Sequence, residues 1–332
     1  MRQVLGSAWA LLLGMLLLMI GNGLQGTLLG LRGAIEGFST FDMSVVLSAY
    51  FVGFLGGSKI APWMISRVGH VRVFAALGST ISAILVLYPT IADPAIWTIL
   101  RVLFGFCFSG VYVTAESWLN NATTNENRGK ALSAYMIVQM AGITVAQMII
   151  TLGDPSGYVL FIIPSVLVSI SFAPILLSVN PTPAFETAKP MSLRQLWAAS
   201  PLGCVGMFFT GGVFSTQFGM SAVYGSLAGL SVAQISTFVA SIYIGGLVLQ
   251  YPIGWFSDRM DRRRLIMLAS LGGALTALFS SVFGGFVPAL VGAGLRIGGM
   301  ATRLCALLVA YTNDYREDVD MAAASGGGVL IN

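Results

Sequence analysis

The sequence predicts an all-α protein that crosses a membrane many times. Of its 332 residues, 56% are hydrophobic and only 9% are charged, whereas about a quarter of the residues of an ordinary soluble domain are charged. Apolar stretches of about 20 residues recur along the chain, which is the length that a helix needs to cross a bilayer core. The basic residues lie in short clusters between these stretches, a pattern typical of membrane orientation rather than of a nucleic-acid-binding surface.

Ten stretches are long and apolar enough to be expected as transmembrane helices. They cover residues 8–31, 43–65, 72–91, 95–117, 130–153, 157–178, 201–224, 232–256, 265–284 and 286–311. The first stretch lies near the N-terminus, but it has no convincing signal-peptide cleavage site and stays apolar as far as Leu31. We therefore expect it to be retained as the first helix.

The lysines and arginines predict a cytoplasmic N-terminus. With this orientation, twelve of the 17 basic residues fall in inside loops, and the outside loops hold only Arg32. Positive charge is enriched in the cytoplasmic loops of membrane proteins. We therefore expect an integral protein of the cytoplasmic (plasma) membrane, of the kind found in the cell inner membrane.

A polar stretch divides the chain into two bundles. Pro181, Pro183 and Pro190 break any continuous helix between the sixth and seventh spans. The segment 192–195 has capping-box spacing and precedes apolar residues on one face, which predicts a short helix on the membrane surface. The expected organisation is an N-terminal bundle at 1–178, a cytoplasmic linker at 179–200, and a C-terminal bundle at 201–332.

The two bundles contain a sequence repeat. The first members of the repeated pairs are Gly53, Trp63, Arg67 and Arg72, and the second members are Gly245, Trp255, Arg259 and Arg264. Both sets end the second apolar stretch of their bundle and enter the loop that follows. Parallel repeats of this kind are typical of transporters whose halves rock about a site near the midplane.

The repeated turn resembles the signature between the second and third helices of each half of the major facilitator superfamily. The better match is Gly254-Trp-Phe-Ser-Asp258-Arg259-Met-Asp-Arg262-Arg263-Arg264, whereas Ser66-Arg67-Val-Gly69-His70-Val-Arg72 has a serine where the family has aspartate. The segments 101–110, 116–120 and 128–131 are similar to the YcaD-like branch of this superfamily. The resemblance implies two six-helix bundles with the second incomplete, because the chain holds ten spans and the start of an eleventh; we expect a C-terminal truncation.

The resemblance implies a secondary active transporter that moves a small solute across the membrane by alternating access, with proton coupling as an option. A transport-inactive remnant or a membrane binding scaffold is the alternative. We expect a monomer in the lipid bilayer with no nucleic-acid partner. His70 is the single histidine and the cysteines lie far apart, so neither a catalytic set nor a metal site is predicted. No cofactor is expected either, because the G-x-G-x-x-G spacing at 21–26 lies inside an apolar helix without a preceding strand.

Gating residues follow from the resemblance and from charges at the inner ends of the helices. The residues concerned are Arg67, Gly69, Arg72, Gly254, Asp258, Arg259, Arg262, Arg263, Glu116 and Arg128. We expect the Asp258 carboxylate to interact with the N-terminus of an eleventh helix, or else to cap its own turn and balance Arg259. For Glu116 we expect an ion pair at an inner gate near Arg67 and Arg128, with plain surface solvation as the alternative.

Charged and polar residues inside the spans are the remaining candidates, because a charge in the bilayer is costly and usually marks function or a buried pair. Arg101 shares a stripe of the fourth span with Gly105, Phe108 and Tyr112, and the resemblance implies a role in proton coupling or gating; the alternative is a buried pair or an interfacial anchor. Candidate contacts to solute in the cavity, which could equally make interhelical hydrogen bonds or ion pairs, are Asn22, Gln25, Tyr112, Gln139, Gln217, Arg296 and Arg303.

Overall fold

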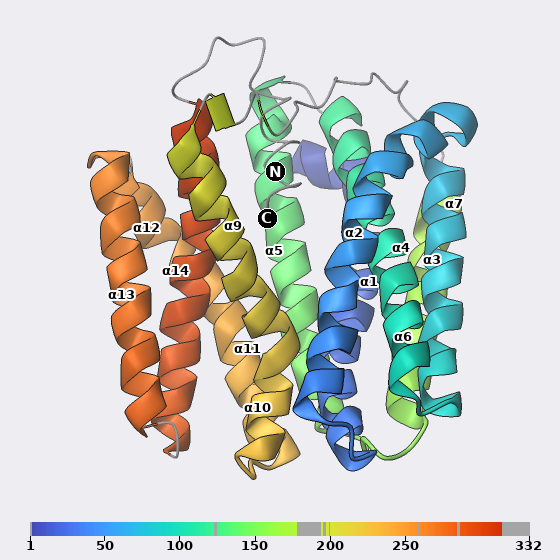
Figure 1. Ribbon diagram of the computed structural model, residues 1–332. Helices are drawn as coiled ribbons and strands as arrows, with labels where there is room; N and C mark the ends of the chain where they lie inside the picture. Colours follow the sequence, from blue (N-terminus) through green and yellow to red (C-terminus); the bar gives the residue numbers. More distant parts are fainter. Residues whose placement is uncertain are drawn as a thin grey trace. The chain divides into compact units, whose positions relative to one another are not determined.

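The computed structural model describes residues 2–122, 125–177, 194, 197–198, 200–257, 259–283 and 286–313. Side chains are described from Trp9 onward in these ranges, except those of 121–122, 125–128, Phe283 and Asn313. In this part of the chain the regular structure is helical, without strands (Figure 1). The all-α membrane fold predicted from composition is therefore confirmed.

The chain divides into two compact units, which are described separately. The first unit comprises residues 1–186 and 222–236, and the second comprises residues 187–221 and 237–332. The helices up to the linker are α1 (Arg2–Ile35), α2 (Thr40–Val68), α3 (His70–Leu87), η1 (Tyr88–Thr90), α4 (Pro94–Ala122), α5 (Asn125–Ile150), α6 (Val159–Ser171) and α7 (Ala173–Leu177). The helices after it are α9 (Pro201–Ser215), η2 (Thr216–Met220), α10 (Ser221–Leu227), α11 (Val232–Val248), α12 (Gln250–Ser257), α13 (Arg262–Phe283) and α14 (Val287–Asn313).

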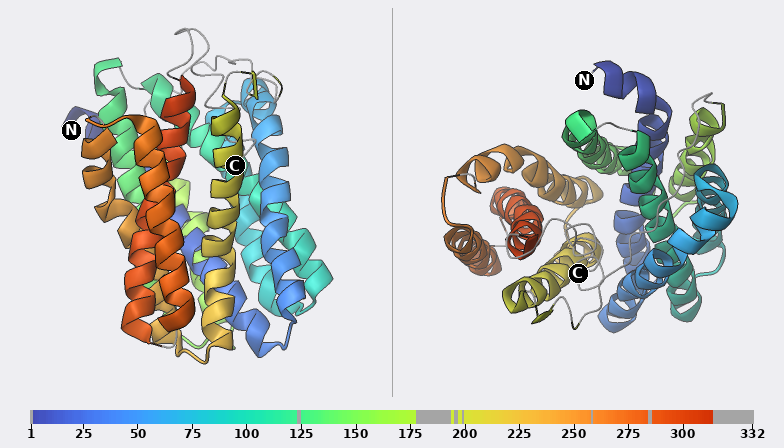
Figure 2. Two further views of the ribbon diagram at one scale, coloured as in Figure 1. Left: turned by 60° about the vertical axis from the view of Figure 1, so that its left-hand side comes forward. Right: turned by 90° about the horizontal axis from the view of Figure 1, so that it is seen from above.

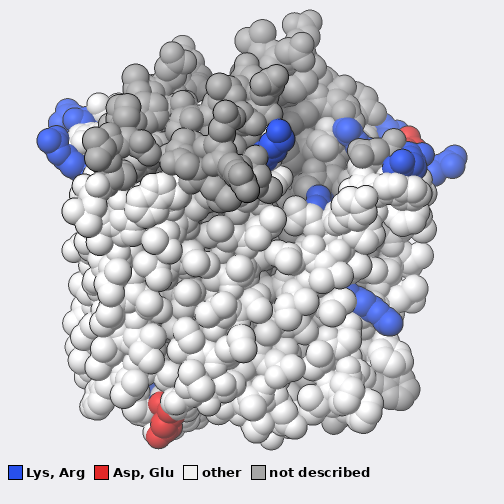
Figure 3. Space-filling model, turned by 180° about the vertical axis from the view of Figure 1, so that it is seen from behind, with Lys and Arg blue, Asp and Glu red and all other residues white. Residues whose placement is uncertain are grey.

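Nine helical stretches of the described residues are long and apolar enough to cross a membrane, whereas the sequence predicts ten. The stretch outside the nine is the predicted span 201–224. It is helical, but the π-helix η2 separates α9 from α10. Figure 3 shows a broad band almost free of charged side chains, with most of the coloured residues at its upper and lower edges. This distribution suits helices that pass through hydrocarbon.

In the first unit, α4 packs along α2 and α3, and α1 packs along α5 and α6. Figure 2 shows these helices end-on in its right-hand view. Glycines bring the helix backbones close together: a Cβ atom at Gly53 would overlap the carbonyl oxygen of Val102, and one at Gly105 would overlap that of Tyr50. Gly21 and Gly23 face side chains of α6 and α5 in the same way. These glycines of the G-x-G-x-x-G sequence therefore serve helix packing.

In the second unit, α14 packs against α13 and α9. A buried apolar cluster joins them, formed by Met207, Leu265, Ile266, Leu307, Leu308 and Tyr311. The glycine packing of the first unit recurs here, because a Cβ at Gly245 would overlap the carbonyl oxygen of Leu295, and one at Gly298 that of Ile242. The second helix of each half thus contacts the fourth through the same kind of close backbone approach.

The helix ends follow from local sequence. Ser39 and Asp42 form a capping box at the start of α2, in which the Ser39 hydroxyl accepts a 3.1 Å hydrogen bond from the Asp42 amide. Gly69, which joins α2 to α3, has a φ of +83°, a conformation that favours glycine. At the equivalent place in the second half, the Asp261 carboxylate instead accepts a hydrogen bond from the Arg264 amide at 3.2 Å and caps α13.

Candidate functional site

Arg101 lies on α4 and its side chain is buried, with 6% of its surface exposed. Its Nη1 donates a hydrogen bond to Oε1 of Gln25 on α1, which is fully buried. The guanidinium carbon lies 5.3 Å from the ring centroid of Tyr50 and 5.7 Å from that of Phe104. The guanidinium therefore lies between an amide and two aromatic rings, whose faces attract cations.

No carboxylate compensates the charge of Arg101 in the described part of the chain. Its Nε atom has no hydrogen-bond partner there, and neither does the Nε2 atom of Gln25. Tyr50 and Tyr88 both lie close to the guanidinium. Since a buried charge without an opposite charge is expensive, this group of Arg101, Gln25, Tyr50 and Tyr88 is the first candidate for a site that acts on solute or coupling ion. We call it the Arg101 cluster.

Aromatic rings continue from the Arg101 cluster along α4. The ring centroids of Phe104 and Phe108 are 4.7 Å apart, and those of Phe108 and Tyr112 are 6.2 Å apart. Phe54 of α2 lies 6.1 Å from Tyr112. The Tyr112 hydroxyl also contacts Sδ of Met19 at 3.3 Å. The stripe predicted on the fourth span is thus largely aromatic and packs against α1 and α2.

Glu116 is exposed, one turn beyond Tyr112, and it lies near Tyr135 of α5. Within the described residues it forms no ion pair with Arg67. Arg67 instead lies over the ring of Trp63, with its guanidinium carbon 4.8 Å from the centroid. The side chain of Arg128 lies outside the described residues, so the predicted gate ion pair stays a prediction.

The other polar residues of the first unit have different surroundings. Gln147 of α5 donates to the Gly23 carbonyl at 3.1 Å and accepts from Thr27 at 3.0 Å, so it joins α1 to α5. Gln139 is buried at 8% exposure, and Asn22 is half-buried. Arg72 is exposed. No hydrogen bond joins these residues to the Arg101 cluster within the described part of the chain.

Gln217 is the main polar candidate of the second unit. It lies in the π-helix η2 and is 8% exposed. Neither atom of its side-chain amide has a hydrogen-bond partner in the described part of the chain. Because π turns within α-helices often occur at functional sites, and because an unpaired buried amide is costly, Gln217 suits a ligand contact.

Two arginines lie seven residues apart on α14. Arg296 is exposed, and Arg303 is half-buried with an Nε atom that lacks a hydrogen-bond partner within the described residues. No acid pairs with either arginine in that part of the chain. Their shared face remains a candidate for contact with an anionic solute.

The basic turn of the second half binds its own helices. The Arg259 guanidinium lies 4.0 Å from the Trp255 ring centroid and donates to the Trp255 carbonyl. Arg263 donates to the Tyr311 hydroxyl at 2.7 Å, and Arg262 donates to the Ala310 carbonyl at 3.2 Å. Two of these arginines therefore fix the start of α13 to the end of α14. Gly254 has open space where a Cβ would be, and Asp258 lies outside the described residues.

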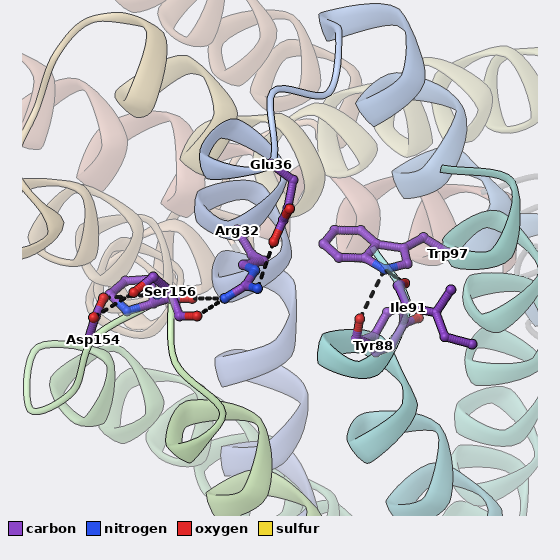
Figure 4. Close-up of polar contacts among 8 residues, drawn as sticks. Arg32, Glu36, Tyr88, Ile91, Trp97, Asp154 and Ser156 are labelled. Atoms are coloured by element: carbon purple, nitrogen blue, oxygen red, sulfur yellow. Dashed lines mark hydrogen bonds and ion pairs between the residues drawn. The ribbon is translucent and has the colours of Figure 1, made fainter. Parts of the chain in front are cut away.

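A polar contact that the sequence analysis missed joins α1 to the loop between α5 and α6 (Figure 4). Arg32 forms an ion pair with Glu36 at 2.6 Å and donates hydrogen bonds to the carbonyls of Pro155 and Ser156. The Ser156 amide and hydroxyl donate to Asp154. These hydrogen bonds lower the pKa of Asp154 below its usual 3.8, and Arg32 contributes to the shift.

We expect Arg32→Gln to loosen this loop. The change removes the ion pair and weakens the hydrogen bonds to the two carbonyls, at a cost of about 1–2 kcal/mol. Hydrogen exchange of residues 151–158 should become faster, whereas Lys59→Gln, which removes an exposed charge from α2, should leave it unchanged. Because the folded pKa of Asp154 is depressed, the loop should also lose protection as the pH falls below about 4. Unchanged exchange in Arg32→Gln would show that Arg32 does not hold the loop.

Comparisons with known proteins agree with this architecture. The model of the family described as Major Facilitator Superfamily matches residues 11–326. Proteins named MFS-type transporter YcaD from Salmonella arizonae and Salmonella typhimurium are each 27% identical over 256 residues, which is 76% of this chain and 66% of the relative. The chain thus spans about two thirds of the length of the curated relatives that it matches.

Solved structures of transporters have the same fold. The nucleoside transporter NupG, as its D323A mutant, superposes with a TM-score of 0.83 at 14% identity, over 97% of this chain and 87% of that chain. A D-xylose-proton symporter superposes with a TM-score of 0.73 at 14% identity, over 97% and 85% of the two chains.

Proposed function

Since the chain belongs to the major facilitator superfamily and is an integral membrane protein with transporter relatives, we propose that it moves a small solute by alternating access. The observation that carries this proposal is the repeated helix pair. In each half, a glycine of the second membrane helix lies against a carbonyl of the fourth, and an arginine at the inner end lies over a tryptophan. Two halves built alike can rock about a shared site.

The proposed orientation has the N-terminus in the cytoplasm, and the proposed location is the cytoplasmic membrane. The support is the strong bias of lysine and arginine toward one set of loops. In this orientation the loop held by Arg32 faces outward, whereas the turns that contain Arg67 and Arg259 face the cytoplasm. These turns are the proposed gating segments.

We also propose that transport is coupled to protons, and that Arg101 and Glu116 take part in this coupling. Arg101 is buried without a carboxylate among the described residues, and Glu116 lies on the same helix, near Tyr135. A proton on Glu116 would change the charge of this helix by one unit, while Arg101 keeps its own charge. The helix would then respond to the proton gradient.

The test is transport by the purified chain in proteoliposomes with an internal pH dye. Radiolabelled uridine, D-xylose, lactate and benzoate serve as probes under an imposed proton gradient. We expect accumulation of at least one probe, with loss of gradient-driven accumulation in Arg101→Gln and Glu116→Gln but residual exchange. Lys59→Gln is the matched loss of a charge and should behave as wild type. Accumulation that persists in both variants would disprove the coupling assignment, and absence of transport of every probe would count against the transport function.

A further inference from the structure

We propose that the transported solute carries a carboxylate, and that Arg101 and Gln25 bind it within the first unit. The inference rests on the proposed transport function and adds the chemical class of the solute. It starts from the buried side chains that the packing of the first unit leaves without partners.

The Arg101 cluster holds more hydrogen-bond donors than acceptors, and its free acceptors among the described residues are tyrosine hydroxyls. A guanidinium has five N–H groups and no acceptor, and here Nε is buried without a partner among the described residues. The Gln25 Oε1 accepts from Arg101, and its Nε2 lies beside the Tyr88 hydroxyl but makes no hydrogen bond of normal geometry among the described residues. A ligand that pairs with Nε of Arg101 and Nε2 of Gln25 must accept hydrogen bonds, because both groups are donors.

The charge of the Arg101 cluster selects an anion. Arg101 stays protonated in proteins, and no acid of the described chain pairs with it. A cation would be repelled there, and a neutral sugar or amide would leave the charge uncompensated. A carboxylate matches the planar fork of the guanidinium and gives two short, charge-assisted hydrogen bonds. It would take the place of Gln25 Oε1 on the fork and accept a further bond from Gln25 Nε2.

The surroundings favour an acid with an apolar or aromatic body. The rings of Tyr50 and Phe104 lie over the guanidinium, and Phe108 and Tyr112 extend the aromatic surface along α4. One arginine in this position suits one carboxylate. Because Arg101 is only 6% exposed, the acid reaches it only in a conformation in which the helices around Arg101 have moved apart.

Binding to the detergent-purified chain tests the inference directly. The probes are benzoate, phenylacetate, lactate and acetate, each compared with its neutral amide, and the readouts are the shift of Tm and direct titration by calorimetry. We expect the aromatic acids to bind and to raise Tm, and the amides to bind at least about tenfold more weakly, which corresponds to one lost charged contact. Arg101→Gln should weaken benzoate binding by a similar factor, and Lys59→Gln should not change it.

The variant Gln25→Glu separates loss of binding from loss of folding. The new carboxylate should pair with Arg101 in place of the ligand, so benzoate binding is lost while the Tm without ligand stays at or above that of the wild type. Equal binding of benzoate and benzamide, full benzoate affinity in Arg101→Gln, or no binding of any of the four acids would overturn the inference.

Transport then distinguishes this inference from the function on which it rests. Acid binding that depends on Arg101, without uptake into proteoliposomes, would refute the transport function and leave the site in place. Uptake of uridine or D-xylose that none of the acids inhibits would support the transport function and refute the carboxylate site.

Discussion

Replacing Gly53 by valine should prevent the first unit from folding. A Cβ at this position would overlap the carbonyl oxygen of Val102, and the next nearest atoms are the carbonyl carbon of Val102 and the amide nitrogen of Phe106. All three are backbone atoms of a helix, so no side chain can rotate away to relieve the overlap. Because α2 packs along α4, the helices would have to separate, at a cost of at least about 3 kcal/mol.

The measurement is the yield of monodisperse protein on size-exclusion chromatography, together with Tm in detergent. Gly56→Ala is the matched control, because a Cβ there has only the Phe106 ring at 3.7 Å, an ordinary contact. It should keep the yield and Tm of the wild type. A well-folded Gly53→Val protein would show that the α2–α4 contact is looser than the structure indicates.

Replacing Trp97 by alanine should give the second largest loss of stability. Trp97 is fully buried at the start of α4, and its Nε1 donates to the carbonyls of Tyr88 at 3.1 Å and Ile91 at 2.9 Å (Figure 4). Its ring packs edge-on against Phe38 and Tyr88, with centroids 4.9 and 5.7 Å away. The alanine variant leaves a cavity and two carbonyls without their donor, so we expect a loss of about 3–5 kcal/mol.

Thermal unfolding in detergent measures this loss. Trp63→Ala is the control, because Trp63 is 56% exposed and its contact with Arg67 contributes less than about 1 kcal/mol. Phe at position 97 should recover part of the lost stability, since it refills the cavity but donates no hydrogen bond. If Trp97→Ala melts at the temperature of Trp63→Ala, the turn at 88–93 does not depend on this indole.

Hydropathy and charge predict most of the membrane helices, because whether a segment crosses the membrane depends mainly on its own composition. The contact of Gly53 with α4 is a tertiary result, although small residues on membrane helices favour close packing. The exception is the span predicted at 201–224. Its composition is apolar, but the widened turn at 216–220 depends on how the backbone hydrogen bonds pair, which hydropathy does not encode.

The partners of the candidate residues could not be predicted in the same way. The sequence marks Arg101 and Gln25 separately as polar residues in apolar helices, but they are 76 residues apart and meet only through the packing of α1 on α4. In the sequence, Arg32 is only a basic residue at the end of an apolar stretch. Its contacts with the loop of Asp154 depend on how the helices pack. Pairing of Arg262 and Arg263 with the end of α14 is also a tertiary result.

The π turn at Thr216–Met220 changes the side of the helix on which the following residues lie. Such a turn takes one residue more than an α-helical turn, so every residue beyond it is rotated by about 100° from the direction that uninterrupted heptad counting assigns. Tyr224, seven residues after Gln217, therefore cannot be placed on the face of Gln217 by counting alone. Deletion of a single residue within 216–220 would restore regular phase and turn the following segment toward different neighbours.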